Sequence, residues 1–122
     1  GTATASRMAG CLQQIFRLQG TAASPAAELA SGLSAGEVMR AHLSSPVVLL
    51  RGCTLKQILY YLNRSMPVIV MTSDRGPQLL TGFDQYNVEL YDPAAASVYK
   101  LGQNDAAAAF TAAGDKYLVC VG

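Results

Sequence analysis

The sequence predicts an α+β fold in which N-terminal helices pack on a C-terminal antiparallel sheet. In the first half of the chain, apolar residues recur at helical spacing behind residues that cap helices. From Val68 onward the apolar residues are β-branched and stand in short runs between turn residues, which is the pattern of strands. Helices therefore come first and a meander of strands follows, with one late helix inserted. This order is typical of an α+β domain rather than of a βαβ repeat.

The first predicted helix starts at Ser6, whose side chain is a suitable N-cap. It ends at Gly20, because glycine commonly follows a helix C-terminus. Its apolar stripe follows the i, i+3, i+4, i+7 spacing and consists of Met8, Cys11, Leu12 and Ile15.

Three further helices are predicted in the first half. Ser24-Pro25 starts a short one, with proline at its favoured first position. Ser34-Ala-Gly-Glu37 matches a capping box and opens a helix that runs towards Leu43. Thr54-Leu-Lys-Gln57 is a second match, and the apolar stripe behind it predicts a helix over 55–63.

The strands follow from short apolar runs bounded by turns. Val47–Leu50, after the break at Pro46, reads as a short buried strand or an extended segment. Val68–Thr72 is the best candidate for a central strand. Four further strands are predicted over 78–83, 88–92, 97–101 and 116–121. A turn over 74–77 precedes the first of them, and a hairpin turn over 84–87 follows it. A helix over 105–113, capped by Asn104 or Asp105 and ended by Gly114, precedes the last strand.

Composition limits the function classes. The chain has 122 residues, which fits a single domain. Only 14% of the residues are charged, against about 25% in average domains. We therefore expect apolar surface that meets another domain or a second copy, so that a homodimer is one candidate state.

Nucleic-acid binding and direct membrane insertion are not expected. The formal net charge is only +1, and the nine basic residues are scattered rather than clustered. No apolar run approaches the roughly 20 residues that span a bilayer.

Cysteine and histidine usage predicts neither a metal site nor a cofactor. Cys11, Cys53 and Cys120 are widely spaced, and His42 is the only histidine. We expect buried or unpaired thiols. One disulfide stays open as an alternative if the domain lies outside the cytoplasm.

The segment from Gly82 to Pro93 carries a family resemblance. Gly82-Phe83-Asp84, a short turn, the strand "VELY" and Asp92-Pro93 follow one another, and "TLKQILYYLNRSMPVIVMT" precedes them. This text resembles the C39-type cysteine peptidases of the papain-like superfamily, which cleave double-glycine leader peptides. The resemblance covers roughly residues 9–122. It implies a papain-like fold over 1–122, as one C39-peptidase-like domain taken from a larger protein.

The resemblance also indicates where the catalytic residues would stand, and this sequence departs from the family at two of these positions. The histidine lies six residues before the glycine of Gly82-Phe83-Asp84, and that position is Gly76. The aspartate that orients the histidine is Asp92. Matching "GCLQQIFRLQG" to the first helix aligns Cys11 with a second, structural position and Arg7 with the nucleophile.

These departures predict loss of catalysis. A nucleophile needs a thiolate whose pKa is lowered, whereas the guanidinium of Arg7 stays protonated. Gly76 has no side chain to move a proton, and Asp92 alone has no base to orient. The resemblance therefore implies a non-catalytic module for protein or peptide interaction, inside a larger bacterial protein that is extracytoplasmic or attached to a membrane.

Two alternatives stay open. One is an active cysteine peptidase with an atypical site that uses Cys11, although Cys11 lies in an apolar stripe and His42 precedes the strands. The other is a structural or dimerisation domain. Expected partners are a peptide or protein segment, or neighbouring domains of the parent chain, held in a groove between helices and sheet. Tyr60, Tyr61, Tyr86, Tyr91 and Tyr99 are candidates to line that groove.

Overall fold

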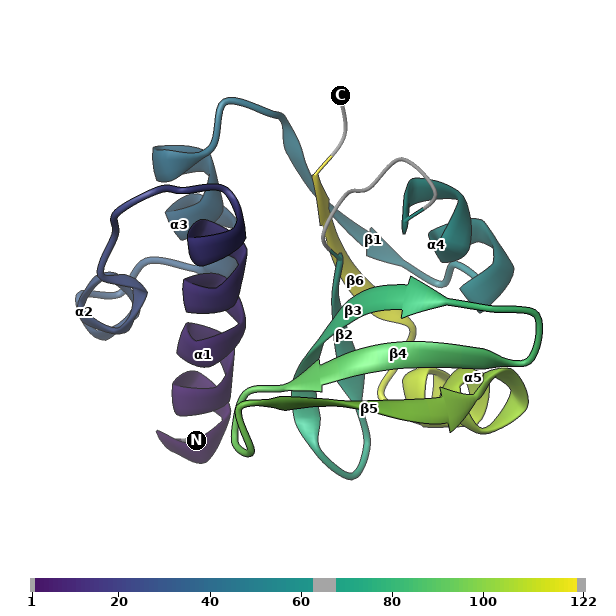
Figure 1. The fold of residues 1–122 in the computed structure, drawn as a ribbon. Helices are drawn as coiled ribbons and strands as arrows, with labels where there is room; N and C mark the ends of the chain where they lie inside the picture. The colour runs from purple at the N-terminus through teal and green to yellow at the C-terminus, as the bar shows by residue number, and fades with distance from the viewer. Residues whose placement is uncertain (1, 63–67, 121–122) are drawn as a thin grey trace.

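The computed structural model describes residues 2–62 and 68–120. In these residues, helices pack on one sheet whose strands differ in length (Figure 1). The helices are α1 (Thr2–Leu18), α2 (Pro25–Ala30), α3 (Ala35–His42), α4 (Leu55–Leu62) and α5 (Gln103–Ala112). The strands are β1 (Val47–Arg51), β2 (Val68–Thr72), β3 (Gly76–Phe83), β4 (Asn87–Asp92), β5 (Ser97–Gly102) and β6 (Lys116–Cys120).

The strands form one antiparallel sheet in the order β1-β6-β2-β3-β4-β5. The segment β2 to β5 is the meander that the sequence predicts. The last strand, β6, lies between β1 and β2, and β1 is a strand at the edge of the sheet. The expectation that this strand is buried is wrong, because an edge strand with no helix over its outer residues leaves Val48 and Leu49 exposed. The α+β class is therefore confirmed. The first strand, β1, joins the sheet by pairing with the last strand, β6.

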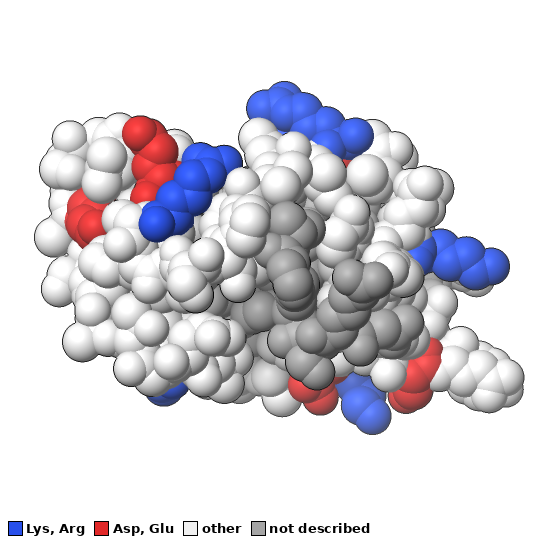
Figure 2. Space-filling model, turned by 90° about the horizontal axis from the view of Figure 1, so that it is seen from above, with Lys and Arg blue, Asp and Glu red and all other residues white. Residues whose placement is uncertain are grey.

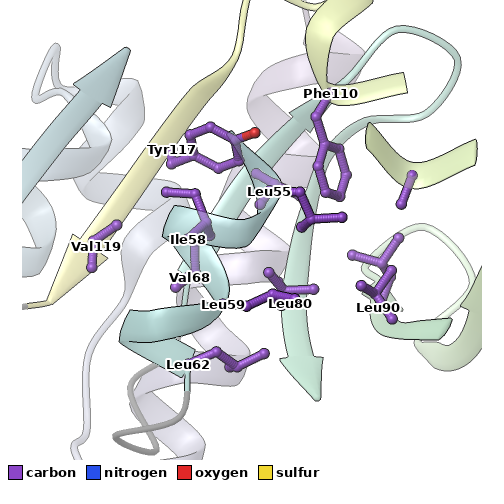
Figure 3. Close-up of a cluster of buried hydrophobic side chains, with 13 residues drawn as sticks. Leu55, Ile58, Leu59, Leu62, Val68, Leu80, Leu90, Phe110, Tyr117 and Val119 are labelled. Atoms are coloured by element: carbon purple, nitrogen blue, oxygen red, sulfur yellow. The ribbon is translucent and has the colours of Figure 1, made fainter. Parts of the chain in front are cut away.

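Each face of the sheet has its own hydrophobic core, because side chains alternate along the strands. In β2, Val68 and Val70 belong to one cluster and Ile69 to the other. Helices α4 and α5 cover the first face, where Figure 3 shows the stripe of α4 directed at the sheet. Helices α1 and α3 cover the second face.

Helix α1 is the main contact between the helical half and the sheet. Its buried stripe is fully inaccessible to solvent and consists of Cys11, Leu12, Ile15 and Phe16. Gly10 lets the helix approach the turn after β4, since a Cβ built on it would lie 2.6 Å from Cβ of Pro93. That separation is shorter than real Cβ contacts, so only glycine fits here.

The two predicted capping boxes are both present. Ser34 Oγ accepts from the Glu37 N–H, and the Glu37 carboxylate accepts from the Ser34 N–H, which completes the capping box. Thr54 and Gln57 make the same reciprocal pair of hydrogen bonds before α4. These local signals position α3 and α4 without help from the rest of the fold.

Two predicted helix starts are wrong. Helix α1 begins at Thr2, so Ser6 lies inside it, because the four residues before Ser6 contain no helix breaker. Helix α5 begins at Gln103, with Gly102 at the N-cap and no capping side chain, rather than at Asn104 or Asp105. The Gln103 N–H donates to the Tyr86 carbonyl, so the chain passes directly from strand into helix.

The predicted turn over 74–77 is too long. Gly76 and Pro77 already belong to β3. Thr72 closes the tighter turn, because its Oγ1 accepts from the Arg75 N–H and donates to the Gly76 carbonyl. The predicted ends of two elements, Asn63 and Val121, lie outside the described residues.

Gly10→Ala tests the contact between α1 and the sheet. Alanine favours a helix over glycine by about 1 kcal/mol, but the added methyl group overlaps Pro93. We expect a net loss of about 1–3 kcal/mol in the free energy of unfolding, measured by urea denaturation. Gly36→Ala is the control, because its methyl group meets only the side-chain end of Arg40, at 3.1 Å, and no backbone atom, so a shift of a few tenths of an ångström accommodates it. Equal stability of the two variants would contradict the proposed close approach.

Candidate functional site

Arg7 of α1 lies beside Gly76, and Asp92 is hydrogen-bonded to Arg75, the residue just before Gly76. Arg7 lies in the second turn of α1, Gly76 is the first residue of β3 and Asp92 is the last residue of β4. Cδ of Arg7 is 3.7 Å from the point where a Cβ on Gly76 would lie. Residues that are 69 positions apart in sequence are thus direct neighbours, as their assignment to one site requires.

The backbone of Gly76 is left-handed. Its φ is +69°, a conformation that residues with side chains rarely adopt. There is room for a Cβ, but the backbone does not suit one. A side chain at this position would therefore carry a backbone cost of about 1–2 kcal/mol.

The carboxylate of Asp92 is held by neighbouring donors. Oδ1 accepts from the Ala94 N–H at 2.9 Å, and Oδ2 accepts from Nη1 of Arg75 at 3.2 Å. Burial acts to raise the pKa of Asp92, but the hydrogen bonds from Ala94, Gln78 and Arg75 outweigh it, so the pKa lies below its ordinary value. In this arrangement Asp92 ends a strand and neutralises an arginine.

Arg75, Gln78 and Tyr99 complete a polar network that the sequence did not single out. The guanidinium carbon of Arg75 lies 4.4 Å from the ring centre of Tyr99, within cation–π range. The Tyr99 hydroxyl donates to Oε1 of Gln78 at 3.0 Å, and Nε2 of the fully buried Gln78 donates to the Pro77 carbonyl at 3.0 Å. The one sequence signal that could have indicated this network is Gln78, a polar residue at the start of the apolar run of β3.

Cys11 is not placed to act as a nucleophile. Its side chain is fully buried in the core between α1 and the sheet. Burial, followed by the negative charge of Asp92, raises the pKa of the Cys11 thiol to about 12. Cys11, Cys53 and Cys120 are all free thiols, so the disulfide left open by the sequence is not formed.

His42 serves packing between helices. Its Nε2 lies 2.8 Å from Oε1 of Glu28, and its ring packs edge-on against Phe16 with the ring centres 5.3 Å apart. Among residues 2–62 and 68–120, no thiol is hydrogen-bonded to this imidazole. His42 therefore links α3 to α2 through Glu28 and to α1 through Phe16.

The tyrosines do not line one groove, which corrects that expectation. Tyr91 packs with the core beneath α1, whereas Tyr61 and Tyr99 pack with the core on the opposite face of the sheet. Tyr86 projects into solvent from the hairpin after β3. Successive side chains along a strand point to opposite faces of the sheet, so tyrosines on neighbouring strands can lie on opposite faces.

A groove does lie between the helices and the sheet, at the β1 side. We call it the α3–β1 groove, and its volume is about 320 Å³. Its lining residues come from α1, the start of α3, and strands β1, β2 and β6: Met8, Ser34, Ala35, Gly36, Arg40, Leu49, Arg51, Ile69, Met71, Lys116, Tyr117 and Leu118. The lining is mainly apolar, with three basic residues and no acidic one.

The described part of the chain offers no other obvious chemistry. No helix within it is long and apolar enough to cross a membrane. The same residues hold no cluster of three or more His, Cys, Asp or Glu side chains suited to a metal ion. Figure 2 shows a face on which a few charged side chains are separated by uncharged surface.

Comparison with solved structures identifies the fold as that of C39-like peptidase domains. A C39-like peptidase of Bacillus anthracis superposes with a TM-score of 0.73 at 14% identity, over 98% of this chain and 88% of that one. The N-terminal peptidase C39-like domain of a toxin secretion ATP-binding protein of Vibrio parahaemolyticus gives 0.72 at 16% identity, over 96% and 98%. No family model and no curated protein matches the chain. The papain-like α+β fold implied by the sequence resemblance is therefore confirmed.

Thiol labelling tests the burial of Cys11. With a thiol-reactive disulfide reagent at pH 8, we expect Cys53 to react first, because it is partly exposed and the other two thiols are buried. Cys11 should react only as fast as the protein unfolds, and in denaturant all three should react at once. Peptide mapping by mass spectrometry assigns the sites, with Cys53→Ser as the control. Fast labelling of Cys11 in the folded protein would contradict this account.

Asp92→Asn tests the polar network through pH. The folded-state pKa of Asp92 is lowered, so its contribution to stability is present above the unfolded value of about 3.9 and is lost as pH falls below it. We expect the variant to lose about 1–3 kcal/mol at pH 7. Urea unfolding between about pH 6 and pH 3 should show a shallower decline for the variant than for the wild type. Parallel curves would show that Asp92 keeps an ordinary pKa.

Proposed function

We propose that this chain is a non-catalytic C39-like module that binds a peptide or protein segment within a larger bacterial protein, extracytoplasmic or attached to a membrane. The observation that carries the proposal is the contact of Arg7 with Gly76. These residues stand where the family resemblance assigns the nucleophile and the base, and neither can fill its role. An intact scaffold with this pair argues for recognition rather than cleavage.

The surroundings of the pair support the same conclusion. Asp92 is hydrogen-bonded to Arg75 and to the Ala94 N–H, so its charge is already engaged. Cys11, the alternative nucleophile, is buried and has a raised pKa. A thiolate at Cys11 would need both access to solvent and a cationic neighbour.

The α3–β1 groove supports binding. A pocket of about 320 Å³ lies at the lower end of the range of about 300–1,000 Å³ that is typical of ligand sites. It is lined mainly by apolar side chains and adjoins the free edge of β1, where an extended segment can pair with the sheet.

A cleavage assay tests the absence of peptidase activity. The purified domain is incubated with a synthetic double-glycine leader peptide, and products are followed by mass spectrometry. We expect none, whereas an active C39 peptidase run in parallel with the same peptide should cleave it. Cleavage by the wild type that disappears in Cys11→Ser would overturn the proposal.

The double variant Arg7→Cys with Gly76→His tests whether restoring the two missing side chains is enough to restore peptidase activity. We expect it to stay inactive and to be less stable by about 1–2 kcal/mol, because histidine at φ +69° is strained. Gly76→Ala, with Arg7 retained, is the control for the backbone cost.

A further inference from the structure

The floor of the α3–β1 groove is an apolar strip contributed by three adjacent strands. Leu49 of β1, Leu118 of β6 and Ile69 of β2 are paired side by side in the sheet, since Leu49 pairs with Leu118 and Leu118 with Ile69. Leu49 remains half exposed. Met8 and Met71 extend the apolar lining, and flexible methionine side chains adapt to varied apolar partners.

Two cations stand at one end of this strip. Arg51 and Lys116 are directly opposed partners across β1 and β6, and both line the groove. Like charges in directly opposed positions destabilise a sheet. Neither residue has an ion-pair partner among the described residues. By contrast, Arg75 and Lys100 are paired with aspartates.

Arg40, the third cation of the groove, is already engaged. Its Nη2 donates to the Val47 carbonyl at 2.9 Å, which ties α3 to β1. Arg40 also lies close enough to Glu37 to help lower the pKa of that carboxyl, after the two hydrogen bonds with Ser34. The unneutralised positive charge in the groove is therefore that of Arg51 and Lys116.

The free edge of β1 is oriented for strand pairing beside this groove. The Val47 carbonyl points away from β6, because it accepts from Arg40, whereas the Gly52 N–H points towards β6 and donates to the Asp115 carbonyl. Backbone groups of alternate residues point to the same side of a strand. The N–H and C=O groups of Leu49 and Arg51 therefore face the open edge.

We propose that the α3–β1 groove binds an extended peptide segment that carries a carboxylate beside its apolar residues. The segment pairs with β1, its alternate apolar side chains lie on the strip around Leu49, and its carboxylate pairs with Arg51 and Lys116. This inference rests on the proposed peptide-binding function and adds the chemical class of the partner. An acidic group there relieves the repulsion between the two cations, and the sheet edge supplies backbone hydrogen bonds.

A random dodecapeptide phage library tests this without knowledge of the natural sequence. The library is selected in parallel on the wild type, on Leu49→Asp, on Arg51→Glu with Lys116→Glu, and on Arg17→Glu with Lys56→Glu. The last variant is the charge-matched control, because its residues lie outside the groove. Circular dichroism and thermal unfolding establish that each variant is folded.

The wild type and the control should enrich apolar segments flanked on one side by Asp or Glu. Leu49→Asp should lose them, and the groove charge reversal should enrich Lys or Arg in place of the acid. For a selected peptide made synthetically, changing the acid to its amide should weaken binding about tenfold in fluorescence anisotropy.

Three results would overturn the inference: no enrichment at all, no acidic preference, or binding unaffected by Leu49→Asp. The last two would leave the peptide-binding function standing, whereas cleavage of the selected peptides would overturn that function itself.

Sedimentation provides a further test. If Leu49→Asp converts a dimer into a monomer, a second copy occupies the groove and the inference is wrong.

Discussion

The site depends on how closely α1 lies against the sheet. Gly10 and Pro93 touch without room for a methyl group, and the stripe from Cys11 to Phe16 is sealed beneath the helix. Arg7 is one helical turn before Gly10, so this contact also fixes its position beside Gly76. The geometry at the end of the sheet is therefore set by packing that involves no polar chemistry.

Because apolar packing specifies the scaffold independently of the polar residues, the fold can match C39-like domains closely at 14–16% identity. Apolar contacts of suitable volume specify the scaffold, and many side chains satisfy them. The polar residues at the end of the sheet follow different requirements. Arg75, Gln78, Tyr99 and Asp92 satisfy one another, as buried polar groups must, whether or not a substrate is turned over. Similarity of fold thus carries no guarantee of activity.

Local signals in the sequence predicted most of the elements. The capping boxes at Ser34 and Thr54 and the stripe of α4 are interactions between residues three or four apart, and they are legible without a structure. The long-range features were not. The insertion of β6 beside β1 depends on pairing across about 70 residues, and local periodicity contains no record of it.

The candidate site divides in the same way. Motif spacing indicated Arg7, Gly76 and Asp92 as corresponding positions, and of these Arg7 and Gly76 are neighbours in the structure. The pairing of Arg75 with Asp92 could not be predicted, because arginines on loops have many possible partners. The early start of α1 was missed because a serine inside a helix looks like a cap when neighbouring alanines and threonines give no boundary. The left-handed backbone of Gly76 was also hidden, since glycine alone does not reveal its φ.

The conformation of Gly76 has a consequence for redesign of this end of the sheet. A Cβ there would meet only Cδ of Arg7, at 3.7 Å, so the obstacle to a side chain is the backbone rather than space. Ala96 and Asp115, with φ of 53° and 50°, show that this chain does carry side chains on left-handed backbone. Asparagine, aspartate and histidine adopt that backbone most readily, so they are the least costly residues with which to introduce a functional group at the entry to β3.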